Sequence, residues 1–415
     1  MKVLWFEIST PARYRNDGCV TAGWQDALEN IVIKCNDIQL FVAFESLSDD
    51  EVRVIDGITY IPMKTEYSWL ERRKREFTCT INEKKIVQKG QKVIREYCPD
   101  LIHVFGNEWP FGLLSEHTNI PLVIHIQGSI IPYYNALYPA RYSDFTLFRA
   151  IGFDLRKQYH NIAWLFFMKS WLNMEKVTWK SVNHYMGRTE WDHALVNMLH
   201  PGATYHHVEE ALRPVFLNTK NRWHGSNNGN LKLLTTGCST FWKGIDVMLK
   251  TAHVLKNANI DFEWTVAGQL SELNKKIVEE KEGLRFDDFN FKFLGFTQPE
   301  ELIERLCDTT LYVHTAYIEN SPNSICEAQI LGVPVVSTMV GGISSLVRDK
   351  VDGVLVPAND PWQMANAIVE LANDKDRMLR YSENTRQLAL QRHSRENILK
   401  ELLSCYRDLL KDTIR

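Results

Sequence analysis

The sequence lacks most features that would assign it to a specialised class of protein. Its formal net charge is only −3 over 415 residues, so no overall field favours binding to nucleic acid. None of the 8 cysteines stands in a C-x-x-C pair, which argues against a zinc ribbon or a redox dithiol. No apolar run approaches the roughly 20 residues needed to cross a bilayer, and the first residues lack the long apolar region of a signal peptide. We therefore expect a cytoplasmic protein from a reducing compartment.

Two series of short apolar runs alternate with helical patterns. The expected strands of the first series are residues 2–8, 38–43, 59–63, 101–105, 121–126 and 184–187. Those of the second are residues 231–236, 263–267, 291–294, 311–314, 333–337 and 353–356. Such alternation predicts parallel sheets covered on both faces, and the length suits two domains. Residues 151–182 stand apart as one long helical stretch rich in Trp, Phe and Met.

We therefore predict an α/β protein with two Rossmann-like, doubly wound domains that face each other across a central cleft. Residues 218–230 are polar and turn-forming, which is typical of an exposed connection. The expected division is residues 1–217 for the first domain and residues 218–395 for the second. Residues 396–415 form an amphipathic helix that could pack back on the first domain.

The most informative segment is HTAYIENSPNSICEA, which starts at His314. It follows an expected strand and opens a helix near Asn323, whose free N–H groups would suit an anion such as a diphosphate. Glu319 and Glu327 flank this point. Carboxylates repel phosphate but accept hydrogen bonds from hydroxyls, which a sugar and a ribose supply. The alternative is a capped helix start with two solvated glutamates.

Three further loops follow strands of the same half. The first contains Gly237 and then Lys243 just before a helix, where a lysine charge suits phosphate oxygens or is simply a surface charge. The second contains Gly295 and Phe296, and the third the pair Gly341-Gly342, which would permit close approach of a ligand or simply form a turn. Ligands of open α/β sheets bind at the carboxyl ends of the strands, so the convergence of these loops favours one ligand site.

The first half contributes one candidate at a strand end. His125 closes the expected strand at residues 121–126 and is followed by Gly128. A lone histidine is more often structural than catalytic, but its place at a strand end and the glycine after it favour a role in a site.

These motifs together resemble a known family. Glu319 and Glu327 match an E-x7-E motif, and the stretches ENSPNSICEAQ and LGVPVVSTMVGG around them are similar to retaining glycosyltransferases of family 4. The resemblance is strong over about residues 231–375 and looser before them. It implies the GT-B fold and a metal-independent hexosyltransferase that uses a nucleotide-sugar, UDP- or GDP-linked, with no other cofactor. It also suggests bacterial surface-polysaccharide biosynthesis.

The resemblance implies a role for each candidate residue. In the catalytic group, Glu319 contacts the donor-sugar hydroxyls, Lys243 the diphosphate, and His125 faces the transferred sugar. In the donor-binding group, Glu327 holds the ribose, three backbone amides hold the diphosphate, and glycine loops approach the base and the sugar. This second group consists of Glu327, Asn323, Ser324, Ile325, Gly295, Phe296, Gly23 and Gly237.

The sequence departs from the family pattern at two places. Many members carry Arg directly after the first loop glycine, where this chain has Cys238, so one phosphate-neutralising charge is missing or comes from elsewhere, for example from Arg213. After the first glutamate stand Asn320 and Ser321 instead of Gly and Phe. Two alternatives to a transferase acting on a glycan or lipid-linked acceptor therefore stay open: a sugar-nucleotide epimerase of the same fold, and a non-catalytic sugar-nucleotide-binding protein.

Two stretches raise the question of a membrane partner. Residues 72–96 are rich in Lys and Arg, and residues 162–171 are rich in Trp and Phe. Basic residues beside aromatic ones suit the surface of an anionic bilayer, which predicts peripheral contact at the inner face of the cell membrane. The alternative is a solvated helix and a buried core helix.

Overall fold

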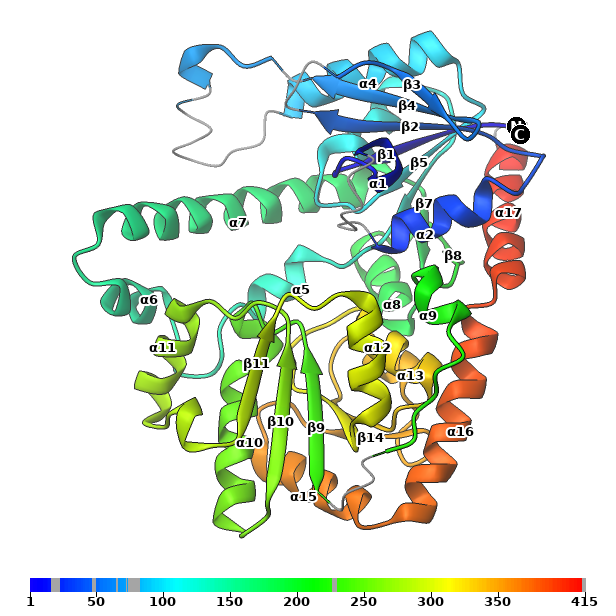
Figure 1. Ribbon diagram of the computed structural model, residues 1–415. Helices are drawn as coiled ribbons and strands as arrows, with labels where there is room; N and C mark the ends of the chain where they lie inside the picture. The colour runs from blue at the N-terminus through cyan, green and yellow to red at the C-terminus, as the bar shows by residue number, and fades with distance from the viewer. Residues whose placement is uncertain are drawn as a thin grey trace. The chain divides into compact units, whose positions relative to one another are not determined.

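The computed structural model describes residues 1–15, 23–46, 50–64, 66–71, 73, 83–225 and 230–412 (Figure 1). The chain divides into two compact units. Unit 1 comprises Met1–Tyr134, Tyr159–Arg213 and Arg392–Arg415, and unit 2 comprises Asn135–Gln158 and Pro214–Gln391. Each unit contains one sheet with helices on both faces, as the alternation of strands and helices predicts.

Unit 1 is built on an eight-stranded sheet in the order β3-β4-β2-β1-β5-β6-β7-β8. All neighbouring strands are parallel except β3 and β4, which pair antiparallel at one edge. The strands are β1 (Lys2–Glu7), β2 (Gln39–Ser46), β3 (Arg53–Ile55), β4 (Ile58–Lys64), β5 (Leu101–Phe105), β6 (Leu122–His125), β7 (His184–Gly187) and β8 (Thr204–His207).

The two faces of this sheet carry separate hydrophobic clusters. On one face, helices α2 (Gly23–Val32) and α17 (Arg395–Asp412) pack on the strands through residues such as Leu28 and Leu402. On the other face lie α4 (Glu83–Tyr97), the 3-10 segment η1 (Pro110–His117) and part of α7 (Leu155–Ser181). Other helices of unit 1 for which the structure gives bounds are α1 (Ala12–Arg15), α5 (Ile130–Asn135) and α8 (Glu190–Leu199).

Unit 2 is built on a six-stranded, wholly parallel sheet in the order β11-β10-β9-β12-β13-β14. The strands are β9 (Leu231–Thr236), β10 (Phe262–Ala267), β11 (Phe291–Gly295), β12 (Leu311–His314), β13 (Val335–Thr338) and β14 (Gly353–Val356). The winding direction reverses between β9 and β12. A crevice for a ligand therefore belongs outside the carboxyl ends of these two strands.

Helices cover both faces of the second sheet as well. One face packs against α10 (Ile245–Asn257), α15 (Pro361–Ala372) and α11 (Glu272–Glu282) through one hydrophobic cluster. The helices α12 (Pro299–Asp308) and α13 (Asn323–Leu331) pack on each other and on β9, β12 and β13. The unit also contains α6 (Asp144–Ile151), α9 (Pro214–Asn218), α14 (Ile343–Leu346), α16 (Lys375–Arg392), and the 3-10 segments η2 (Phe241–Lys243) and η3 (Phe286–Asp288).

The predicted class, α/β with two doubly wound sheets, is confirmed. The structure differs from the expected division in that residues 135–158 cluster with unit 2, because Tyr142 and Leu147 join its core. The long helical stretch expected over residues 151–182 is the single helix α7, which starts at Leu155; α6 ends at Ile151, and Gly152, with a φ of +64°, lies between the two helices. Within the described ranges, no helix is both long and apolar enough to cross a bilayer.

The C-terminal helix α17 belongs to unit 1 and packs against α2 and β5. Tyr406 of α17 reaches the centre of the sheet, where its hydroxyl accepts a hydrogen bond from Trp5 Nε1 at 3.0 Å. The same hydroxyl lies 2.7 Å from Nδ1 of His103. The three side chains are buried, so this helix is part of the core of unit 1 and not an appendage.

Candidate functional site

The loops after β9 and β12 are fastened to each other at the point where the winding direction of the second sheet reverses. Thr315 Oγ1 donates to the carbonyl of Lys243 at 3.0 Å, and the amide of Tyr317 donates to the carbonyl of Trp242 at 2.7 Å. Gly244 has a φ of +74°, and a Cβ placed there would lie 1.9 Å from the carbonyl oxygen of Thr315. Only glycine fits this contact, so the lysine-glycine pair places Lys243 directly beside the β12 loop.

Glu319 is fixed by the third loop, which follows β13. Its carbonyl accepts a hydrogen bond from the amide of Gly342 at 2.9 Å. Gly341 has a φ of +51°, and a Cβ there would lie 1.8 Å from the same carbonyl oxygen. The close approach expected of the Gly341-Gly342 pair is therefore made to the protein's own backbone. This contact fixes the position of the Glu319 backbone, from which its side chain extends.

Lys243 and Glu319 form an ion pair between Nζ and Oε1. The Glu319 residue is only 5% exposed, while about a quarter of the lysine side chain is exposed. His314 Nε2 lies 3.8 Å from the same carboxylate oxygen, but burial lowers the pKa of His314 to about 4, so its ring is neutral at pH 7. The charge beside Glu319 is therefore that of Lys243.

The start of α13 is the expected anion site. Pro322 precedes the helix and makes no side-chain cap, and the first N–H groups of any helix lack intrahelical partners. The amide of Ile325, however, already donates to the carbonyl of Pro322 at 3.0 Å. Within this turn the amides of Asn323 and Ser324 are therefore better placed for a phosphate than that of Ile325, which stays a prediction. The Ser324 hydroxyl also hydrogen-bonds to that of Tyr312.

Glu327 lies one turn inside α13 and is 4% exposed. Neither Glu319 nor Glu327 is thus a solvated surface carboxylate, which disagrees with the alternative of a simple helix start. The two side chains stand on opposite sides of the first turn of α13 in the sequence. The expected phosphate position at the helix start therefore lies between the two glutamates along the chain and stays a prediction.

Three glycines line the carboxyl ends of β9, β10 and β11. The amide of Gly237 donates to the carbonyl of Ala267 at 2.9 Å, and the amide of Gly268 donates to that of Gly295 at 2.7 Å. Gly237 and Gly295 have φ values of +75° and +68°, and nothing lies within 4 Å of a Cβ built on either. Phe296 follows and is 71% exposed. The edge is therefore open above these two glycines, with an exposed aromatic ring beside it.

Cys238 does not replace the missing charge. It is buried in the hydrophobic cluster of unit 2, and this burial raises the pKa of its thiol to about 12. At pH 7 the side chain is a neutral apolar group under the loop. Cys238 therefore supplies no charge to the loop after β9.

The sequence alone assigned no role to His314, whose Nε2 lies 3.8 Å from the Glu319 carboxylate. Its signal was the same as that of His125: a histidine that closes an apolar strand at the carboxyl edge of a sheet. Applying that criterion to both halves would have found it.

In unit 1, His125 also lies at the carboxyl edge of its sheet. The ring packs against Trp24, with centroids 4.9 Å apart, and neither ring nitrogen has a hydrogen-bond partner among the described residues. Burial lowers its pKa well below the usual value, so the imidazole is neutral. Gly23 starts α2 directly before Trp24, and the preceding residues 16–22 lie outside the described residues.

Further polar groups gather along the same edge of the first sheet. Both carboxylate oxygens of Glu7 and both polar side-chain atoms of Asn107 are buried without a partner in the part of the chain that the structure describes. Arg188 follows β7 and stacks over Trp24 at 4.8 Å. His125 pairs with Phe105 and Met186 of the neighbouring strands. Glu7 comes directly after the pair of Phe6 with Val104, and Arg188 lies two residues after Met186. The side chains of Glu7, His125 and Arg188 therefore lie on one face of the sheet. Buried polar groups without partners mark a place where a ligand or water supplies them.

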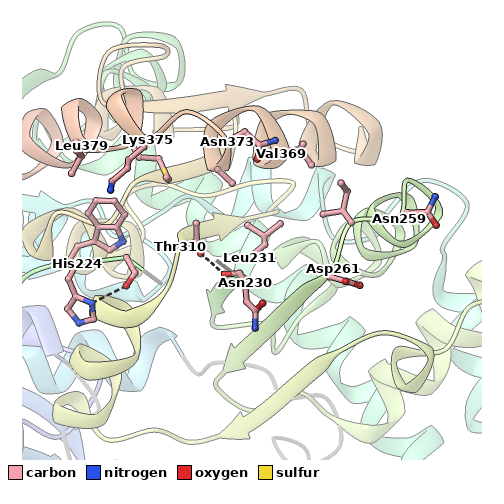
Figure 2. Close-up of a pocket in the computed structure, with 15 residues that line it drawn as sticks. His224, Asn230, Leu231, Asn259, Asp261, Thr310, Val369, Asn373, Lys375 and Leu379 are labelled. Atoms are coloured by element: carbon pink, nitrogen blue, oxygen red, sulfur yellow. Dashed lines mark hydrogen bonds between the residues drawn. The ribbon is translucent and has the colours of Figure 1, made fainter. Parts of the chain in front are cut away.

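A large cavity of unit 2 lies at the opposite edge of its sheet (Figure 2). Its volume is about 600 Å³, and it is lined by residues that precede strands, such as Asn230 and Thr310, and by Lys375 and Leu379 of α16. These positions are at the amino ends of β9 and β12. The cavity is therefore separate from Lys243 and Glu319, and we do not assign the donor site to it.

The comparison with protein families decides the classification of unit 2. Residues 218–388 match the family model described as "Glycosyl transferases group 1". The chain carries a group 1 glycosyltransferase domain. This agrees with the resemblance to family 4 noted from the E-x7-E motif.

Curated relatives support the same classification over part of the chain. The amylovoran biosynthesis glycosyltransferase AmsK of Erwinia amylovora is 27% identical over 191 residues, which is 44% of this chain and 45% of that protein. A D-inositol 3-phosphate glycosyltransferase of Corynebacterium urealyticum is 34% identical over 118 residues, 28% of each chain. The matches thus span less than half of the length of these relatives.

Solved structures match the fold over the whole chain. Sucrose-phosphate synthase from Thermosynechococcus elongatus has a TM-score of 0.72 at 15% identity, with 99% of both chains covered. Anabaena HepE in complex with UDP and glucose has a TM-score of 0.63 at 16% identity, covering 98% of this chain and all of that one. The predicted GT-B fold is confirmed.

Proposed function

We propose that this group 1 glycosyltransferase domain transfers a hexose from a nucleotide-sugar to a glycan or lipid-linked acceptor, with retention of anomeric configuration. The observation that carries the proposal is the meeting of Lys243, Glu319 and the start of α13 where the winding of the second sheet reverses. A cation and helix-start amides suit a diphosphate, and the adjacent carboxylates suit hydroxyls. A nucleotide-sugar contains both groups.

The roles of the residues follow from these contacts. Lys243 leaves Glu319 and turns to the diphosphate, where it stabilises the negative charge that develops on the departing nucleoside diphosphate. The amides of Asn323 and Ser324 assist it. Glu319, relieved of its ion pair, accepts hydrogen bonds from the sugar hydroxyls, and Glu327 accepts those of the ribose. The leaving phosphate then assists attack of the acceptor on the same face of the sugar, as the family resemblance implies.

The remaining candidates recognise the two ends of the donor. The open edge at Gly237 and Gly295 and the exposed ring of Phe296 suit a nucleobase, since aromatic rings stack on bases. His125 and Gly23 present unit 1 to the transferred sugar. The neutral ring of His125 can accept or donate one hydrogen bond to a hydroxyl.

We infer a UDP-linked hexose as the first donor to test. Solved structures of HepE contain UDP, UDP with glucose, or UDP-glucose. Relatives named for amylovoran and colanic acid biosynthesis favour assembly of a surface polysaccharide as the process. The acceptor is then a growing glycan or its lipid-linked precursor.

A donor screen tests the proposal. Purified protein is incubated with a panel of UDP- and GDP-linked sugars, with and without glycan acceptors, and release of nucleoside diphosphate is measured with and without a chelator. We expect release that depends on the acceptor, is unchanged by the chelator and is lost in Lys243→Gln. NMR of the product should show the anomeric configuration of the donor.

Other outcomes identify the alternatives. Conversion of the sugar without an acceptor would indicate the epimerase. Donor binding without any turnover, across the panel, would indicate a non-catalytic sugar-nucleotide-binding protein. Binding of no donor by the wild-type protein would contradict the site itself.

A further inference from the structure

The junction between α6 and α7 exposes four large apolar side chains on one short segment of unit 2. Phe153 is fully exposed, and Leu155, Phe145 and Phe148 are 83%, 69% and 52% exposed. Single exposed apolar residues are ordinary, but four large ones between Phe145 and Leu155 mark a candidate interaction surface. We call these four residues the α6–α7 platform.

Buried side chains and hydrogen bonds of the same segment fix the position of the platform. Tyr142 and Leu147 are buried in the core of unit 2, and the Tyr142 hydroxyl donates to Glu282 of α11 at 2.9 Å. The side-chain amide of Gln158 donates to the carbonyls of Phe148 at 2.7 Å and Gly152 at 3.0 Å, which closes the end of α6. The apolar side chains are therefore presented by a fixed turn and do not collapse onto the protein.

Basic residues outnumber acidic ones on the platform segment. Arg149, Arg156 and Lys157 are exposed on the same segment. The acids there are Asp144 and Asp154, and Asp154 is paired with Lys157 at 3.1 Å. Beside α6 lies a hollow of about 530 Å³ lined by Phe145, Arg149, Ile277, Glu280 and Lys281. The segment between Asp144 and Lys157 thus carries a net positive charge around exposed aromatic rings.

We propose that the α6–α7 platform docks on the surface of an anionic lipid bilayer. Exposed Phe and Leu side chains can enter the boundary between headgroups and acyl chains, while Arg and Lys remain at the anionic headgroups. The centres of protein–protein interfaces are depleted of charged residues, so Arg and Lys beside the apolar side chains favour a lipid surface over a protein partner. The proposal concerns binding alone and holds independently of the transfer reaction.

This surface differs from the two stretches that the sequence suggested. In residues 162–171, Ala163 and Met168 are buried, so that stretch is partly core, although Ile162 and Phe166 are exposed. Of the basic stretch 72–96, residues 72 and 74–82 lie outside the described residues. The α6–α7 platform combines large apolar side chains that are at least half exposed with a hydrogen-bonded turn and neighbouring Arg and Lys residues.

Flotation with vesicles tests the proposal on the full chain. Vesicles of phosphatidylcholine, with and without phosphatidylglycerol, are mixed with protein at low and high salt. We expect retention on the phosphatidylglycerol vesicles at low salt only. The triple variant Phe148→Ser, Phe153→Ser, Leu155→Ser should lower the partition coefficient by roughly tenfold or more, because each exposed ring or branched chain contributes apolar area. The exposed Trp362→Ser serves as its control and should bind like wild type.

A charge pair gives a second, matched comparison. Lys157 and Lys411 are both exposed and both paired with an Asp three residues earlier, at 3.1 and 3.0 Å. Lys157→Gln should weaken binding by about fivefold at low salt, since a surface cation contributes about that much at an anionic bilayer. Lys411→Gln should have no effect.

Two results would overturn the proposal. One is failure of wild-type protein to float with anionic vesicles at low salt; the other is equal retention of the triple variant. If sedimentation shows that the platform variants abolish self-association without changing flotation, the occupant is a second copy of the chain and the lipid proposal is wrong. Nucleoside diphosphate release with water-soluble acceptors should be unchanged in all these variants, so the outcome is separable from that of the donor screen.

Discussion

At the scale of single residues, the ion pair between Lys243 and Glu319 joins the two halves of the proposed chemistry. The lysine would neutralise the diphosphate, and the glutamate would hold the sugar, yet without a donor each is the partner of the other. Donor binding must exchange this pair for two new contacts. The pair also compensates the charge of a buried carboxylate, because an unpaired glutamate at this position would carry the full cost of desolvation.

Replacing each glutamate by glutamine should separate binding from turnover. Glu327→Gln should chiefly raise the donor KM, because ribose contacts are equal in the ground and transition states. Glu319→Gln should chiefly lower kcat, since its contacts can strengthen as positive charge develops on the sugar ring. A charge-assisted hydrogen bond contributes roughly 1.5–3 kcal/mol, so each loss should cost about ten- to a hundredfold.

The measurement is steady-state kinetics after a thermal melt has shown that both variants fold. Glu301→Gln, a half-exposed carboxyl on α12, is the matched control and should retain full activity. If Glu319→Gln and Glu327→Gln both fold and both retain full activity, the assignment of the donor site to α13 is wrong.

At the scale of elements, glycine contacts between loops set the site geometry. Gly341→Ala would place a methyl group against the carbonyl of Glu319, so the β13 loop must shift and carry the glutamate with it. We expect a fall in kcat of at least roughly tenfold, in keeping with the sensitivity of catalysis to displacements near 1 Å. Gly283→Ala is the control: it also has a positive φ, of +67°, but open space around it. It should lose about 1 kcal/mol of stability and no activity. Equal activity of the two variants would remove this role of Gly341.

A buried carboxyl on α7 should make stability depend on pH. Glu175 accepts a hydrogen bond from the amide of Ile131 at the start of α5 at 2.8 Å, and burial raises its pKa to about 7. Between the unfolded pKa near 4.5 and pH 7, the folded protein holds a proton that the unfolded chain has lost. The contribution of Glu175 to stability is therefore present below pH 4.5 and falls as pH rises to 7.

Glu175→Gln removes this dependence while keeping an acceptor for Ile131. Relative to the variant, the wild-type protein should lose about 3 kcal/mol of unfolding free energy between pH 4.5 and pH 8. Urea unfolding of both proteins across this range measures it, with the exposed Glu300→Gln as control. A wild-type-to-variant difference that is the same at every pH would contradict the burial effect.

The strands of both sheets could be predicted because buried parallel strands are short apolar runs bounded by turns. Leu311–His314 and Gly353–Val356 have the bounds expected from the sequence. The strands β3 and β8 were missed, since they are edge strands whose residues are mostly part-exposed or exposed and give no apolar run. The membership of residues 135–158 in unit 2 depends on contacts with α11, far along the chain, which no local pattern contains.

For the candidate site, the sequence located the loops but not the contacts between them. Strand ends located the loops that carry Lys243, Glu319 and Gly341, because the carboxyl ends of parallel strands share one edge. The ion pair between the first two, 76 residues apart, and the engagement of the Ile325 amide required coordinates. The burial of Cys238 was also hidden, since a single cysteine in a loop has no periodic pattern.

At the scale of the whole molecule, the chain passes between the two units four times, after Tyr134, Gln158, Arg213 and Gln391. The segments that precede Arg213 and follow Gln391 contact each other within unit 1. Arg392 Nε lies 3.1 Å from a carboxylate oxygen of Glu209, and His393 Nδ1 lies 2.7 Å from the carbonyl of Glu210. These contacts make a common anchor for the segments that enter and leave unit 2. Each unit keeps its own core, which permits rigid-body motion between them.

We predict that the two units close on the donor. Candidate donor groups are divided between them, with Lys243, Glu319 and Glu327 in unit 2 and His125 in unit 1, so full engagement of the sugar requires both. Small-angle scattering should show a smaller radius of gyration with saturating nucleoside diphosphate or unreacted nucleotide-sugar than without ligand. Calorimetry on the same sample establishes saturation. Lys243→Gln, which should bind the diphosphate weakly, should keep its ligand-free radius of gyration at the ligand concentration that lowers that of the wild-type protein. Identical scattering profiles of the wild-type protein with and without saturating ligand would show that the units do not close, and His125 would then have to act without any change in the positions of the units.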